Sequence, residues 1–332
     1  MSNEFAKCLL DWYGAYGRDL PWRVKGGAHP NPYVVLVSEV MLQQTTVKTV
    51  LSYFEKFMNR FPTVFDLANA DEEEVLLFWQ GLGYYTRAKS LHQSAKMIAG
   101  KFQGKFPSTK EDVLKLKGLG PYAVASFLAL AFNAPETVVD GNVVRIISRL
   151  YHFTLPQDEM TDIIRQKAES LTDKENAADY ASAIMDLGAT VCTKKKPTCG
   201  ICPVQRFCAS KGLPDLEQIP MRKKSEKKKF NGYVYIIKNK EGKVFIRKRK
   251  EKGLLSGLYE FIWAENKIFK NAKETKVNVS HIFTHIDMSL KICFLQSETA
   301  PTADGFFVDV QDMGKYAFST LMKKVMKKAD LG

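Results

Sequence analysis

The sequence lacks any apolar stretch long enough to cross a membrane and any segment typical of a secretory signal. Its longest apolar runs, residues 33–42 and 125–132, are shorter than the about 18 residues that a membrane helix needs, and Glu39 interrupts the first. The first 16 residues lack an apolar core followed by a small-residue cleavage site. We therefore expect a cytoplasmic protein, nucleoid-associated if bacterial, with no membrane partner. We also expect it to be a monomer.

Cysteine is also scarce, and the few cysteines are crowded. The chain has six in 332 residues, a pattern that favours metal ligation in a reducing compartment over disulfides. Four of them lie within one short loop, at Cys192, Cys199, Cys202 and Cys208. The spacing Cys-x6-Cys-x2-Cys-x5-Cys suits a cuboidal iron-sulfur cluster. Structural zinc is the alternative, although only one Cys-x2-Cys pair is present.

Acidic residues are fewer than basic ones. The chain carries 49 Lys and Arg against 36 Asp and Glu, a formal charge of +13. An excess of positive charge favours a polyanionic partner such as DNA, because phosphate neutralisation releases counterions. Generic solubility is the alternative explanation of the same charge.

Up to about residue 190, the residues that begin and end structural elements are those typical of helices. Asn31 and Pro32 predict an N-cap and a first helical residue, and Ser108 with Glu111 fits a capping box. Further helices are expected over 84–99, 121–132, 141–151, 161–171 and 176–189.

The composition changes after the last crowded cysteine. A lysine-rich stretch with prolines is typical of an exposed linker. Beyond it, residues 233–238 and 244–249 are rich in β-branched and aromatic residues, and the turn between them contains Gly242, so they predict a hairpin. We expect a domain over 1–215 that includes the cysteine loop (192–208), a basic linker over 216–230 and a second domain over 231–332.

Gly118 and Gly120 stand between two helical patterns and allow a turn with positive φ whose backbone approaches a phosphate. Asp140 precedes another helical pattern, where an aspartate is usually an N-cap. Together with the four cysteines, these features resemble the endonuclease III superfamily of base-excision glycosylases. The segments LPWR, SEVMLQQT, GLGYY, VDGNV and MDLGATVC are similar to the MutY family of adenine glycosylases within it, and the likeness covers residues 9–208.

The resemblance implies a mainly α helix-hairpin-helix glycosylase domain with a [4Fe-4S] loop, followed by a smaller α+β Nudix-like domain. It implies removal of adenine opposite 8-oxoguanine or guanine in duplex DNA, by base flipping and acid-assisted hydrolysis of the N-glycosidic bond. Such a reaction needs one group to protonate the leaving base and another to stabilise the oxocarbenium-like sugar. The four cysteines would hold the cluster.

The resemblance also assigns roles to single residues. Glu39 would be the acid, because its apolar stripe would raise its pKa, and Asp140 would face the anomeric carbon. Asn142 would orient Asp140, and Tyr122 would line the same site. The residues expected to touch DNA or a base are Trp22 and Arg23 at the adenine pocket, Gln44 and Tyr84 as wedges in the duplex, and Gly118 and Gly120 at the hairpin.

One further absence bears on the chemistry. A strand-cleaving member of the superfamily needs a lysine amine just after the hairpin glycines, and this chain has Pro121 and Tyr122 there, with Lys115 and Lys117 before the turn. We therefore predict a monofunctional glycosylase.

Two parts of the chain depart from the family pattern. Ser182 stands where the family usually has Glu or Gln to contact adenine, so adenine selectivity is open at this position. In the second domain Phe283, Thr284 and His285 replace Phe-Ser-His and keep a hydroxyl to read the oxidised base. No Glu-rich pyrophosphohydrolase box is present, so no nucleotide hydrolysis is expected. A metal pair of His281 with His285 is the alternative.

Two other functions fit the same residues. One is another glycosylase of the superfamily, acting on thymine mismatches or oxidised pyrimidines. The other is a lesion-binding protein without catalysis, which would have no use for both Glu39 and Asp140.

The positive charge leads to the first prediction. The affinity for duplex DNA should fall steeply between low and moderate salt, because each phosphate contact releases counterions. Fluorescence anisotropy of a labelled duplex across a salt series measures the slope. A flat response would contradict the expectation of a DNA partner.

Overall fold

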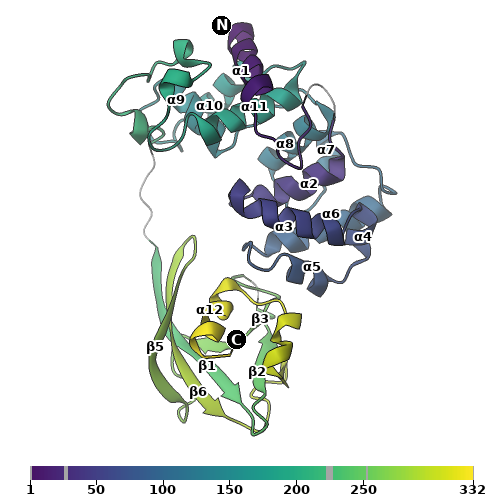
Figure 1. Cartoon of the computed structure of the whole chain (residues 1–332), viewed down its shortest axis with the longest axis vertical. Helices are drawn as coiled ribbons and strands as arrows, with labels where there is room; N and C mark the ends of the chain where they lie inside the picture. The colour runs from purple at the N-terminus through teal and green to yellow at the C-terminus, as the bar shows by residue number, and fades with distance from the viewer. Residues whose placement is uncertain (1, 26–28, 222–226, 252, 332) are drawn as a thin grey trace. The chain divides into compact units, whose positions relative to one another are not determined.

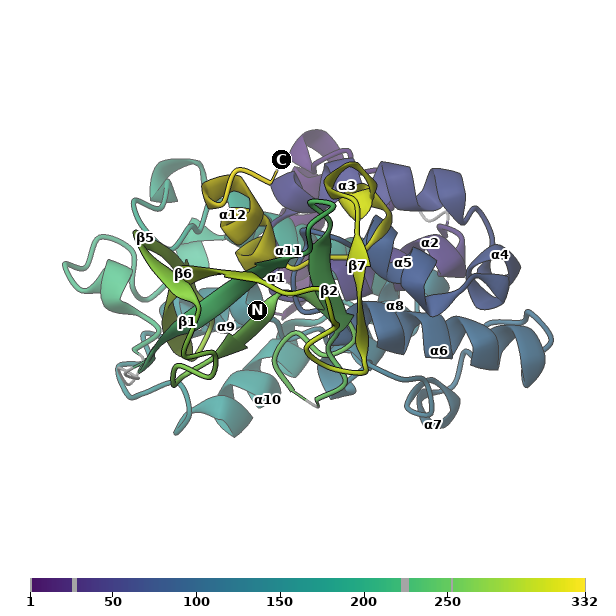
Figure 2. The ribbon, with the colours of Figure 1, turned by 90° about the horizontal axis from the view of Figure 1, so that it is seen from below.

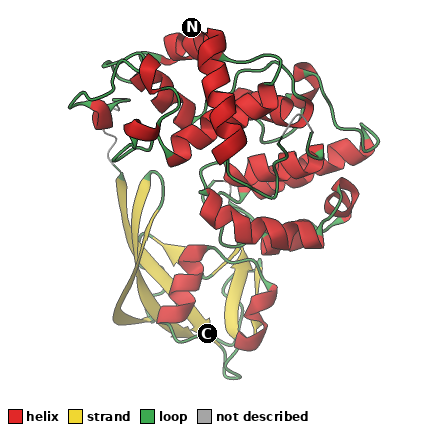
Figure 3. Cartoon of the chain, turned by 45° about the horizontal axis from the view of Figure 1, so that its top comes forward, coloured by secondary structure: helices red, strands yellow, loops and turns green. Residues whose placement is uncertain are grey.

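The computed structural model describes residues 2–25, 29–221, 227–251 and 253–331. The chain divides into two compact units (Figure 1), the first made of Met1–Phe54, Thr63–Phe65 and Gln93–Lys224, and the second of Glu55–Pro62, Asp66–His92 and Ser225–Gly332. Helices build the first unit, and the strands all belong to the second (Figure 3). Within the described ranges, no helix is long and apolar enough to cross a membrane.

The helices from the N-terminus to the cysteine loop are short. They are α1 (Ser2–Tyr16), α2 (Pro32–Leu42), α3 (Val47–Arg60), α4 (Val64–Asn69), α5 (Glu72–Phe78), α6 (Thr86–Gly100), α7 (Lys110–Val113), α8 (Pro121–Phe132), α9 (Gly141–Leu150), α10 (Thr161–Leu171) and α11 (Ala177–Thr190). The bounds of α8 and α10 are those expected from the sequence, and the ends of α6, α9 and α11 differ by one or two residues.

The helix α8 is the centre of the first unit. Its residues from Ala123 to Ala131 are all buried, as expected for a helix that is apolar on every side. The equally apolar α2 packs against it, and so does α11. The three helices thereby bring Glu39, Tyr122 and Met185 into one region of the first unit.

Two local expectations are wrong in detail. The N-cap of α7 is Thr109, whose hydroxyl accepts a hydrogen bond from the Asp112 amide at 3.3 Å, and Ser108 lies one residue too early. Ser108 and Thr109 are both suitable N-cap residues, so the sequence alone does not tell which of them begins the helix. Of the hairpin glycines, Gly118 has φ +78°, whereas Gly120 is the extended N-cap of α8 at φ −79°.

The second unit contains a mixed sheet. Its strands are β1 (Lys228–Lys238), β2 (Val244–Lys248), β3 (Tyr259–Glu260), β4 (Ile262–Ala264), β5 (Lys273–Ile282), β6 (Ile286–Gln296) and β7 (Gly305–Val308). The order is β3-β2-β1-β6-β5, with β4 paired to β1 and β7 to β2. Only β1 and β6 run parallel among the described pairs. The expected hairpin of β1 and β2 is confirmed by the antiparallel pair Lys238 and Val244.

One helix packs against the sheet of the second unit. The amphipathic α12 (Thr320–Lys328) packs beside β5 (Figure 2) and covers a core that includes Phe261, Leu290 and Phe318. Part of the expected linker, residues 222–226, lies outside the described residues, and β1 begins at Lys228.

The cap of α2 gives a stability prediction. The Asn31 Oδ1 atom accepts a hydrogen bond from the Tyr33 amide at 2.9 Å, so Asn31→Ala should cost about 1 kcal/mol of unfolding free energy. Asn176 is the matched control, because it precedes α11 without a side-chain capping bond. Urea titration of both alanine variants measures the difference, and equal losses would show that the cap contributes nothing.

Candidate active site

A cavity of about 800 Å³ opens in the first unit at the ends of α2, α8, α9 and α11. It brings together seven of the residues predicted from the sequence: Trp22, Arg23, Glu39, Gln44, Tyr122, Asp140 and Asn142. From α11, the lining residues are Met185 and Ala189. Ser182 is buried one turn earlier on that helix and is not part of the lining.

Glu39 is the buried carboxyl group on α2. Its side chain belongs to a helix whose other residues are mostly apolar, and the residue is 8% exposed. Burial raises its pKa to about 6, an effect that the nearby Ser126 hydroxyl and Arg23 oppose. Because a group with a pKa near 6 is partly protonated near neutral pH, Glu39 can donate a proton into the cavity.

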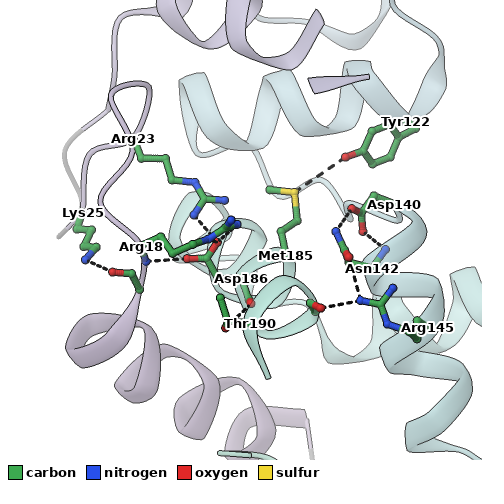
Figure 4. Close-up of polar contacts among 12 residues, drawn as sticks. Arg18, Arg23, Lys25, Tyr122, Asp140, Asn142, Arg145, Met185, Asp186 and Thr190 are labelled. Atoms are coloured by element: carbon green, nitrogen blue, oxygen red, sulfur yellow. Dashed lines mark hydrogen bonds and ion pairs between the residues drawn. The ribbon is translucent and has the colours of Figure 1, made fainter. Parts of the chain in front are cut away.

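Asp140 is the second carboxyl group of the cavity and also the N-cap of α9. Its Oδ1 atom accepts hydrogen bonds from the amides of Asn142 at 2.8 Å and Val143 at 2.7 Å, and its Oδ2 atom accepts one from the Asn142 carboxamide at 2.7 Å (Figure 4). Burial raises the pKa of Asp140, although these donors and Arg145 favour the ionised form. The carboxylate is thus held rigidly while it faces the cavity.

Arg145 fixes the carboxamide that touches Asp140. Its guanidinium donates to Asn142 Oδ1 at 3.0 Å, to the Gly188 carbonyl at 2.6 Å and to the Cys192 carbonyl at 2.8 Å. Gly188 permits this approach, because a Cβ there would lie 2.5 Å from the Asn142 Cβ. Neither residue was predicted from the sequence, and the only available signal was their place inside VDGNVVR and MDLGATVC.

A buried ion-pair network forms another wall of the cavity region (Figure 4). Asp186 is fully buried, and its Oδ1 atom accepts from Arg23 at 2.6 Å and from the Arg18 Nε at 2.9 Å. Burial acts to raise the pKa of Asp186, but Arg23 and Arg18 together hold it below its usual value. Asp186 and Arg18 were also not predicted from the sequence.

The expected lesion-contacting residues lie in the second unit. Phe283, Thr284 and His285 form the turn between β5 and β6, which the Phe283 amide closes by donating to the Ile286 carbonyl at 2.8 Å. The hydroxyl groups of Tyr84 and Thr284 are 2.5 Å apart. His281 lies on β5, and among the described residues no group of three or more His, Cys, Asp or Glu is arranged around a single metal ion.

The four cysteines of the loop line one small cavity together with Arg149. All four are free thiols. Burial raises the pKa of Cys202 to about 11, and the other three thiols of the loop add to this shift, so each of them lies close enough to Cys202 to act on its charge. The donor set and the shared cavity fit a polynuclear cluster, because a cuboidal cluster is larger than one ion.

Comparison with known proteins gives the class of the chain. Residues 37–172 match the HhH-GPD superfamily of base excision DNA repair proteins, and residues 233–328 match the NUDIX domain. A solved thermostable thymine-DNA glycosylase is 27% identical with a TM-score of 0.56, over 63% of this chain and 95% of that one. An endonuclease III–DNA complex shares the fold, with a TM-score of 0.52 at 21% identity over 63% of this chain and 96% of that one. Fold and site define a DNA N-glycosylase, a hydrolase of the helix-hairpin-helix class.

Closer relatives give the family. An adenine DNA glycosylase of Buchnera aphidicola from Baizongia pistaciae is 34% identical over 85% of this chain and 82% of the relative. One from the Schizaphis graminum strain is 29% identical over 97% and 98%. The human adenine DNA glycosylase is 38% identical over 65% of this chain and 41% of its own length. The chain belongs to the adenine DNA glycosylase family.

The raised pKa of Glu39 leads to a stability prediction. The ordinary pKa is 4.5 and the folded value is about 6, so the stability present below 4.5 is lost as the pH rises through 6. Relative to Glu39→Gln, the wild-type unfolding free energy should fall by about 2 kcal/mol across this window. Urea titrations of both proteins at several pH values measure the difference. Parallel pH profiles would contradict the buried acid.

Proposed function

We propose that this enzyme removes adenine paired with 8-oxoguanine or guanine in duplex DNA, as the first step of base excision repair. The observation that carries the proposal is a pair of carboxyl groups, the buried Glu39 and the half-buried Asp140, on one cavity. Two carboxyl groups in different environments are what N-glycosidic hydrolysis requires. The names of the family members support adenine as the base.

The different surroundings of Glu39 and Asp140 give the two groups different chemical roles. Glu39 is desolvated and carries the proton that the adenine ring takes up as the bond to the sugar breaks. Asp140 accepts three hydrogen bonds from Asn142 and Val143, so its negative charge is available to stabilise the positively charged sugar. The free base leaves with this proton, and water then attacks the anomeric carbon and gives one of its own protons to the Glu39 carboxylate, which restores the acid.

Adenine reaches these groups only after it leaves the base stack. The cavity volume of about 800 Å³ accommodates a flipped nucleotide, with Trp22 and Tyr122 as aromatic walls. Gln44 and Tyr84 fill the gap left in the duplex. Thr284, at the β5–β6 turn, offers a hydroxyl to the base opposite the adenine.

The cavity supports a monofunctional mechanism. Lys48 is the lysine among its lining residues, and it lies at the start of α3. Tyr122 stands on the first turn of α8, where a Schiff base-forming enzyme would need an amine. Strand breaks should therefore appear only after alkali.

The four cysteines hold a [4Fe-4S] cluster in this proposal. Such a cluster is ligated by cysteine thiolates, and it would brace the loop that carries Lys194, Lys195 and Lys196. Arg149 fits this bracing role, because it is 1% exposed and donates to the Thr193 carbonyl at 2.7 Å and to the Lys194 carbonyl at 3.0 Å. The three lysines of this loop would then face the phosphates of the DNA backbone.

The direct test is single-turnover release of adenine from duplexes with adenine opposite 8-oxoguanine and opposite guanine. Strand breaks are scored before and after alkali, and a thymine–guanine duplex serves as the substrate of a different glycosylase. We expect adenine release with alkali-dependent breaks. Release of thymine instead would overturn the choice of base and leave the class of enzyme intact.

Glu39→Gln tests the acid. The variant should lose about two orders of magnitude or more in the single-turnover rate, while it retains affinity for the lesion duplex. Glu111→Gln is the matched control, because Glu111 is an exposed carboxylate of α7. Near-normal turnover by Glu39→Gln would remove Glu39 from the mechanism.

The cluster is tested by analysis of the purified protein. We expect about four iron atoms and about four sulfide ions per chain, with a sharp loss of both in Cys202→Ser. The buried Cys293→Ser is the matched control, because that thiol lies in the second unit. Stoichiometric zinc without sulfide would contradict the iron-sulfur assignment.

A further inference from the structure

The loop that carries Tyr84 has an unusual backbone. Gly81 and Gly83 have φ values of +112° and +75°, and Tyr84 itself is in the left-handed region at φ +48°. Residues with a Cβ rarely adopt this conformation. The side chain of Tyr84 is 45% exposed, so something other than tight burial must hold it there.

Arg87 lies directly behind this tyrosine. Its guanidinium carbon is 5.3 Å from the centre of the Tyr84 ring and 5.5 Å from that of Trp79. The same guanidinium donates to the Gly83 carbonyl at 3.2 Å, which also accepts from the Trp79 indole at 3.2 Å. The backbone amide of Arg87 donates to the Tyr84 carbonyl at 2.9 Å. One residue therefore contacts both the ring and the strained backbone beside it.

The environment makes these contacts strong. Arg87 is only 7% exposed, and burial lowers its pKa to about 10, so it is still charged at neutral pH. A desolvated guanidinium interacts more strongly with an aromatic face than an exposed one. The planar guanidinium of Arg87 can stack on the Tyr84 ring and donate to the Gly83 carbonyl at the same time. A lysine ammonium cannot do both.

We propose that Arg87 is a positioning residue that holds Tyr84 in the orientation in which it enters the duplex. The inference rests on the proposed function, in which Tyr84 fills the space left by the flipped adenine. The ring keeps one face against Arg87 and presents its exposed part to DNA. Its hydroxyl, 2.5 Å from that of Thr284, is set by the same orientation.

A double-mutant cycle separates this role from general stability. Arg87→Met should slow single-turnover adenine release by about tenfold in the wild-type background. In the Tyr84→Ala background the same substitution should change the rate by less than about twofold, because the positioned ring is gone. Arg87→Lys should not restore the rate. Equal effects in both backgrounds, or full rescue by lysine, would overturn the proposal.

Arg60→Met is the matched control. Arg60 also lies over an aromatic ring, 4.9 Å from Phe61, and belongs to the same unit, but it pairs with Glu74 at 2.6 Å. Its replacement should leave the rate unchanged. If Arg87→Met does not fold, as judged by circular dichroism, Arg87→Lys replaces it in the double-mutant cycle. The lysine variant should then slow adenine release in the wild-type background and have little effect in the Tyr84→Ala background.

A second readout separates this inference from the proposed function. A duplex with 2-aminopurine at the flipped position reports unstacking by its fluorescence, without any bond cleavage. If the wild type releases no adenine, the proposed function fails, and the cycle is measured on this fluorescence instead. If the effects of Arg87→Met and Tyr84→Ala on this fluorescence are coupled, the positioning role stands. If they are independent, the positioning role is wrong.

Discussion

Desolvation of two carboxyl groups beside one cavity, Glu39 buried and Asp140 half-buried, is the constraint on which the rest of the first unit depends. Taking an ionisable group out of water disfavours its charged form, so both Glu39 and Asp140 have raised pKa values. The apolar helices α2 and α8 create the dry surroundings of Glu39. The helix N-terminus of α9 compensates Asp140 with two amides. Two carboxyl groups thus take opposite roles, Glu39 as a proton donor and Asp140 as a negative charge.

Partly or fully buried arginines hold segments together around this cavity and at the cysteine loop. Arg18 and Arg23 neutralise Asp186, Arg145 joins Asn142 to the start of the cysteine loop, and Arg149 satisfies carbonyls within that loop. A guanidinium presents five donors in a planar fork, so it can tie several segments that have no regular hydrogen bonding of their own. This explains how irregular loops keep functional groups in place.

Local patterns in the sequence predict what depends on local physics. The cap at Asn31, the helix Pro121–Phe132 and the hairpin of β1 and β2 follow from neighbouring residue types. The cavity residues were found because the resemblance supplied them together. The clash that Gly188 avoids with Asn142, by contrast, joins residues 46 positions apart, and no periodicity encodes such a contact. The exclusion of Ser182 from the cavity lining depends likewise on how α11 is rotated against α8.

The most direct test of the central claim is the pH dependence of single-turnover adenine release. If the protonated form of Glu39 drives bond cleavage, the rate constant should fall about tenfold per pH unit at pH values above the pKa of about 6. Glu39→Gln should show no such decline. A wild-type rate that stays constant or rises through this range would contradict a catalytic role for the buried acid.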